Sequence, residues 1–180
     1  MFAELLARLA RGLEAARLPY MVVGGQAVLL HGEPRLTRDV DVTLGAGLER
    51  LPDLLAALGA MALRPLVDPA DFTHRTLVLP CDDPATGLRV DFILSFTPYE
   101  REAIARAKLV TVGGARVRFA TAEDLVVHKV LAGRPRDLED VRGILRKAPD
   151  LDASAVRTAL RAIGDAVAEP LVDRLDALLA

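Results

Sequence analysis

Two aspartates one residue apart have the type and spacing that permit metal chemistry. Asp39 and Asp41 lie in the run DVDVTL at 39–44. Alternate residues of a strand point to the same face of a sheet, so the two carboxylates are expected side by side. Such a pair is repulsive, and a divalent cation is the usual partner that compensates it. The pair therefore predicts a metal site that serves phosphate chemistry, with a solvated strand face as the alternative.

A third carboxylate can join them from a later strand. In the segment LRVDFIL at 88–94, apolar residues alternate with others, and this alternation predicts a strand with Asp91 opposite its apolar face. If the two strands are neighbours in the right register, Asp91 joins Asp39 and Asp41. Three carboxylates can hold two Mg²⁺ (or Mn²⁺) ions, which clamp the attacking and leaving oxygens of a phosphoryl displacement. The third acid can then accept the proton of the acceptor hydroxyl.

A glycine pair precedes the aspartates. Gly24 and Gly25 lie between a predicted strand at 20–23 and a predicted short helix at 26–31. Bare backbone amides at the start of a helix can cradle a phosphate group. A glycine pair is also common in tight turns that only permit close packing. Because the pair is followed by the two aspartates on a strand, the combination favours a phosphate site.

Polar residues in the C-terminal third offer a second set of candidates. Lys129 lies within an apolar helix predicted to begin near Thr121, where a lysine usually extends its ammonium group to solvent. Arg136 and Asp137 follow at the start of the next predicted helix. A negative charge is favourable there, so helix capping is the alternative explanation for Asp137.

The elements around these residues predict a mixed α/β protein. Helices and strands alternate up to about residue 120, including a hairpin at 108–119 with a Gly-Gly turn, and only helices follow. We therefore expect an α/β core at 1–120 and a helical region at 121–180. The chain has 180 residues, a net charge of −2, one cysteine and no apolar run of membrane-spanning length, which predicts a cytoplasmic protein without disulfides.

The glycine pair and the three aspartates together resemble the signature of the nucleotidyltransferase superfamily with the DNA polymerase β-type fold. The run from Gly24 to Asp41 is similar to small bacterial members, namely AbiEii-type toxin nucleotidyltransferases and aminoglycoside nucleotidyltransferases. Many members have Gly-Ser where this chain has Gly24-Gly25. The resemblance implies a mixed sheet flanked by helices, with a C-terminal helical region.

The same resemblance implies roles for further residues. In AbiEii-like members a lysine on a helix after the core reaches the nucleotide phosphates, and Lys129 matches that position. The pattern that follows it in those members is matched by the run RPRDLED at 134–140. Gly24 and Gly25 would hold the triphosphate together with Lys129. The remaining candidates near the nucleotide are Gln26, Arg38, Arg136 and Asp137.

The implied activity is transfer of a nucleoside monophosphate from a metal-bound nucleoside triphosphate to an acceptor hydroxyl, with release of pyrophosphate. The acceptor is open between a tRNA, a protein side chain and a small molecule. Residues 101–147 hold 11 basic and 6 acidic side chains, which suits a nucleic acid but is more often an ordinary solvated surface. One alternative is a non-catalytic nucleotide-binding or toxin–antitoxin-type interaction protein on the same fold. The other is an unrelated α/β domain.

Overall fold

The computed structural model describes residues 1–95 and 97–179. Contacts within the chain divide it into two compact units. The first comprises Met1–Gln26 and Leu36–Ala120, and the second comprises Ala27–Arg35 and Thr121–Ala180. The predicted division into a core at 1–120 and a helical region at 121–180 stays a prediction. Among the described residues, no helix combines the length and apolar character needed to span a bilayer.

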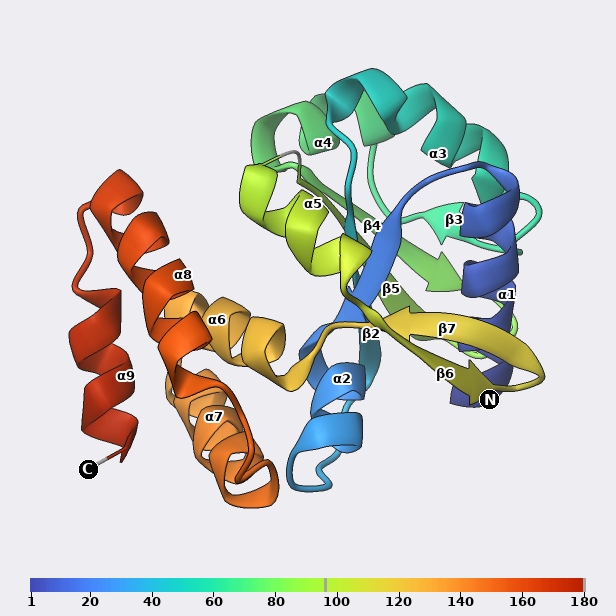
Figure 1. The fold of residues 1–180 in the computed structure, drawn as a ribbon. Helices are drawn as coiled ribbons and strands as arrows, with labels where there is room; N and C mark the ends of the chain where they lie inside the picture. Colours follow the sequence, from blue (N-terminus) through green and yellow to red (C-terminus); the bar gives the residue numbers. More distant parts are fainter. Residues whose placement is uncertain (96, 180) are drawn as a thin grey trace. The chain divides into compact units, whose positions relative to one another are not determined.

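The first unit contains a seven-stranded mixed sheet, which confirms the predicted mixed α/β class. Its strands pair in the order β3-β4-β5-β2-β1-β7-β6 (Figure 1). The β2–β5 and β1–β7 pairs are parallel, and the other pairs are antiparallel. The strands are β1 (Tyr20–Val23), β2 (Asp39–Leu44), β3 (Arg64–Pro65), β4 (Val78–Asp83), β5 (Leu88–Leu94), β6 (Lys108–Val112) and β7 (Ala115–Phe119).

Helix α1 (Phe2–Ala15) of the first unit packs on this sheet through its apolar side. Its leucines at helical spacing are fully buried, and the helix contacts β6 and β7 (Figure 1). The remaining helices are the 3₁₀ turn η1 (Leu48–Arg50), α3 (Leu51–Leu58), α4 (Pro69–Thr76) and α5 (Pro98–Ala105). The sequence did not predict α4, because its polar composition lacks an apolar period. Its start is fixed by Pro69 in the first turn and by Asp68, whose carboxylate accepts a 2.9 Å hydrogen bond from the amide of Asp71.

Helix α2 (Gly24–His31) belongs to both units. Its first three residues, Gly24 to Gln26, are part of the sheet-containing unit, and the remainder is part of the helical unit. The loop that follows enters β2 at Asp39. The segment between the glycine pair and the aspartates, Ala27–Arg35, is therefore part of the second unit.

The second unit is otherwise helical. Its helices are α6 (Ala122–Ala132), α7 (Pro135–Lys147), α8 (Ala153–Val167) and α9 (Leu171–Leu179). Helix α6 begins as predicted at Thr121, whose hydroxyl accepts a 3.1 Å hydrogen bond from the amide of Asp124, and it ends at Gly133 in a left-handed conformation with φ +64°. It contacts each of the other three helices. Buried aliphatic side chains such as Val126, Val130 and Ile144 form the core of this unit.

Candidate active site

The register between β2 and β5 determines the arrangement of the three predicted carboxylates. These strands pair in parallel, with Asp41 opposite Asp91 and Asp39 opposite Arg89. Residues directly opposite on neighbouring strands share a face, and neighbouring strands lie about 4.8 Å apart. The three aspartates therefore occupy one face of the sheet, which is the arrangement that the sequence required. We call this surface, formed by Asp39, Asp41, Arg89 and Asp91, the carboxylate face.

The glycine pair lies against the carboxylate face. A Cβ atom at Gly24 would lie 1.7 Å from Oδ2 of Asp41, and Gly24 itself has φ +59°. A Cβ atom at Gly25 would lie 2.3 Å from Oγ1 of Thr37. Real Cβ atoms do not approach other atoms this closely, so any larger residue at 24 or 25 would displace these side chains. The glycines thus have a packing role, and it brings Asp41 next to the start of α2.

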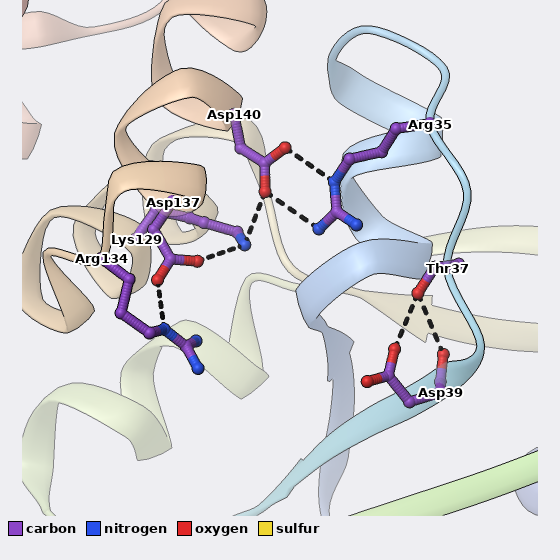
Figure 2. A network of polar contacts seen from close by, with 7 residues as sticks. All are labelled: Arg35, Thr37, Asp39, Lys129, Arg134, Asp137 and Asp140. Carbon is purple, nitrogen blue, oxygen red and sulfur yellow. Dashed lines mark hydrogen bonds and ion pairs between the residues drawn. The ribbon is translucent and has the colours of Figure 1, made fainter.

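Thr37 is a site residue that the sequence analysis missed. Its hydroxyl donates a 2.7 Å hydrogen bond to Oδ1 of Asp39 (Figure 2). This bond holds one carboxylate oxygen of Asp39 and fixes the orientation of the other. Threonine hydroxyls often bond to groups a few residues away along the chain, so the position of Thr37 two residues before Asp39 was the available signal.

Arg89 is the second residue that the sequence analysis did not assign to the site. Its Nε donates a 2.8 Å hydrogen bond to Oδ1 of Asp91. The hydrogen bond with Asp91 raises the pKa of Arg89, and the charges of Asp39 and Asp41 raise it further against the opposing effect of burial. A guanidinium group therefore neutralises part of the negative charge on the carboxylate face.

The carboxylate oxygens of Asp39, Asp41 and Asp91 are the candidate ligands for a divalent metal. Carboxylate oxygens are the ligands that Mg²⁺ and Mn²⁺ prefer, and the aspartates fit by chemistry and by their common face. Within residues 1–95 and 97–179, however, no three His, Cys, Asp or Glu side chains are arranged so that they could hold a metal ion. Asp91 instead forms an ion pair with Arg89, whose Nε lies 2.8 Å from its Oδ1.

The start of α2 offers a buried hydrogen-bond donor. Gln26 is 7% exposed, and its Nε2 finds no hydrogen-bond partner among the described residues. A buried amide without an acceptor costs free energy, and such groups in native proteins call for an explanation. Gln26 is the third residue of α2, so this unsatisfied donor belongs to the helix that begins at the glycine pair.

A buried charge network occupies the second unit. The Nζ of Lys129 lies 2.7 Å from Oδ1 of Asp137 and 2.8 Å from Oδ2 of Asp140 (Figure 2). Arg35 donates to both oxygens of Asp140, at 2.8 and 3.0 Å, and Arg134 donates to Asp137 at 2.6 Å. Lys129 is therefore buried and does not extend its ammonium group to solvent. Asp137 forms ion pairs with Lys129 and Arg134, so its role is not limited to capping α7.

Electrostatics keep both acids of this network ionised. Burial alone would raise the pKa of Asp137 and of Asp140, but hydrogen bonds and charges from Lys129 and the two arginines outweigh it and lower both pKa values. The residues Arg38 and Arg136 are exposed. That Lys129, Arg38, Arg136 and Asp137 contact a nucleotide stays a prediction.

Several solved structures have a similar fold. Two structures of the antibiotic-resistance factor ANT(2'')-Ia match at 18% identity. One covers 92% of each chain with a TM-score of 0.62. The other, in complex with adenylyl-2''-tobramycin, covers 89% of this chain and 97% of that chain with a TM-score of 0.61. The lincosamide antibiotic adenylyltransferase LnuA with bound lincomycin matches at 12% identity over 78% of this chain and 94% of that chain, with a TM-score of 0.52.

These likenesses confirm the nucleotidyltransferase fold, a mixed sheet flanked by helices. They agree with the aminoglycoside-nucleotidyltransferase part of the predicted resemblance, and the AbiEii-like part stays a prediction. A search of curated proteins finds no match. A family model described as "Nucleotidyltransferase of unknown function (DUF6036)" matches residues 3–163. The chain therefore belongs to this family of nucleotidyltransferases of unknown function.

Proposed function

We propose that this protein transfers a nucleoside monophosphate from a nucleoside triphosphate to an acceptor hydroxyl and releases pyrophosphate. The observation that supports this most directly is the parallel β2–β5 register, with Asp41 opposite Asp91 and Asp39 on the same face. Membership of a family described as nucleotidyltransferases agrees with it. Carboxylates on adjacent strands are what a metal-assisted in-line phosphoryl displacement requires.

The aspartates have two kinds of role in the proposed reaction. Asp39 and Asp41 would hold Mg²⁺ or Mn²⁺, and the bound ion supplies positive charge to the phosphates and acidifies the acceptor hydroxyl. Asp91 accepts the proton of that hydroxyl. A bond forms between the acceptor oxygen and the α-phosphorus, while the bond from the α-phosphorus to the bridging oxygen breaks. The electron pair of the broken bond leaves with pyrophosphate.

The start of α2 is the proposed phosphate site. The amides of Gly24 and Gly25 and the positive end of the helix dipole favour a phosphate oxygen there. The unpaired Nε2 of Gln26 would donate to the same group. Since Gly24 packs directly on Asp41, a phosphate held at this point would lie beside the carboxylate face.

The first acceptors to test follow from the structural relatives. The ANT(2'')-Ia and LnuA structures contain adenylyl-2''-tobramycin and lincomycin, so aminoglycosides and lincosamides are candidate acceptors here, alongside tRNA and protein. The experiment incubates the purified protein with each nucleoside triphosphate labelled at the α-phosphate, Mg²⁺ or Mn²⁺, and each acceptor class. We expect one nucleotide to become attached to one class, with pyrophosphate released.

Variants connect this activity to the carboxylate face. Asp39→Asn and Asp41→Asn each remove a ligand for the metal and should lower turnover about 100-fold or more, since metal charge stabilisation contributes several kcal/mol. Asp176→Asn, which breaks an exposed ion pair with Arg157, is the matched control and should retain full activity. Undiminished turnover in either active-site variant would contradict the proposal. Nucleotide binding without transfer to any acceptor would favour the non-catalytic alternative.

A further inference from the structure

Arg89 lies among the proposed catalytic carboxylates. On β5 it shares a face with Asp91, and on the neighbouring strand it is directly opposite Asp39. Its side chain is 54% exposed, whereas that of Asp91 is 18% exposed. The side chain of Arg89 is therefore partly in solvent while its Nε bonds to Asp91.

Arg89 bonds to one of the two carboxylate oxygens of Asp91, the residue proposed to bind the metal and to act as the base. Nε of Arg89 donates to Oδ1 of Asp91 over 2.8 Å. A carboxylate oxygen that accepts this charge-assisted bond is less available to a metal ion.

We propose that Arg89 is a positioning residue that competes with the divalent cation for Asp91. In the ion pair, the guanidinium group neutralises part of the charge on the carboxylate face and holds Asp91. When the cation binds, Arg89 leaves Asp91 and turns to solvent, and Asp91 becomes available as ligand and base. This inference rests on the proposed function, because it concerns the same three carboxylates.

The exchange is energetically feasible because the pair is partly exposed. Ion pairs at the surface stabilise a protein only weakly, so a dication can displace the guanidinium group at small cost. Asp39 remains oriented meanwhile by the hydroxyl of Thr37, which donates to it at 2.7 Å. The predicted consequence is that Arg89 weakens metal binding in the resting protein.

Direct binding of Mn²⁺, followed by the electron paramagnetic resonance signal of the free ion, tests this without turnover. Arg89→Met should bind Mn²⁺ about tenfold more tightly than the unmodified protein, because a full positive charge a few ångströms from a dication is removed. Arg89→Lys keeps the charge on a shorter, differently shaped donor group and should lie between the two. Arg157→Met, which breaks the exposed pair with Asp176 on α8 and α9, is the control and should leave Mn²⁺ affinity unchanged.

A double-variant cycle shows whether Arg89 acts through Asp91. The Arg89→Met substitution is made once in the unmodified protein and once in Asp91→Asn. The change in the logarithm of the Mn²⁺ dissociation constant should be less than half as large in Asp91→Asn as in the unmodified protein. An unchanged affinity in Arg89→Met, or an equal gain with and without Asp91, would overturn the inference while leaving the proposed function intact. Absence of Mn²⁺ binding in the unmodified protein and in every variant would instead contradict both.

Discussion

The residues that orient Asp39 and Asp41 are small and uncharged. Thr37 donates to Asp39, and the space for its side chain exists only because residue 25 is glycine. Gly24 makes the corresponding space for the carboxylate of Asp41. The glycine pair thus determines the positions of both aspartates of the DVD run, in addition to any contact it makes with phosphate.

Loss of the Thr37 hydroxyl tests this orientation. Thr37→Val keeps the shape of the side chain but removes the donor, and we expect Mn²⁺ affinity to fall about fivefold, equivalent to a net hydrogen bond of about 1 kcal/mol. Thr37→Ser retains the hydroxyl and should restore most of the affinity. The measurement is titration of Mn²⁺ into the two variants. Equal affinities for both would show that the hydroxyl has no part in orienting Asp39.

At the scale of elements, the buried charge network of α6 and α7 stabilises the helical unit. Lys129→Met leaves Asp137 and Asp140 buried with only their arginine partners. Removing one partner of a buried ion pair typically costs 3–5 kcal/mol, and we expect about 3 kcal/mol because the arginines remain. Urea unfolding gives the free energy of unfolding. Arg157→Met, in an exposed pair, should cost less than about 1 kcal/mol, and a similar loss in both would contradict a special role for Lys129.

The same network predicts how stability depends on pH. The folded-state pKa values of Asp137 and Asp140 are lowered, so their contribution is complete above the unfolded-state value of about 4 and is lost as pH falls through the folded-state values. The free energy of unfolding should therefore decrease steadily below about pH 5. Asp137→Asn should make this decrease shallower while lowering stability at neutral pH. Measurements between about pH 7 and pH 3 compare the two slopes.

At the scale of the whole chain, the two units are interleaved in sequence. Residues 27–35 belong to the helical unit although they lie between two segments of the sheet-containing unit. Arg35 connects this segment to the helical unit, because it donates hydrogen bonds to both carboxylate oxygens of Asp140 on α7. A fragment of residues 1–120 would therefore lack the partners of this segment.

Limited trypsin digestion can test this dependence. In a fragment of residues 1–120, Arg35 has lost Asp140, and we expect cleavage after Arg35 much faster than in the whole chain. Mass spectrometry identifies the site of the first cut. Arg75, which pairs with Asp71 inside α4, is present in both molecules and should be cut at similar rates. Equal protection at Arg35 would show that residues 1–120 fold as an independent domain.

The sequence alone determined the local features of this protein. Period-two alternation placed Asp39 and Asp41 on one face and gave the bounds of β5, while Thr121 and Gly133 defined the ends of α6. These features depend on residues within a few positions of one another, so the sequence displays them directly. Helix α4 was not predicted, because its polar sequence lacks apolar residues at helical spacing.

Only the tertiary structure decided which charged groups meet. The pairing of β2 with β5 in a register that sets Asp41 beside Asp91 joins residues fifty positions apart, and strand neighbours follow from packing of the whole sheet. The same holds for Arg89 against the carboxylate face and for Lys129 between two aspartates. Charge alone does not choose a partner, because burial and backbone geometry determine which oppositely charged groups come within bonding distance.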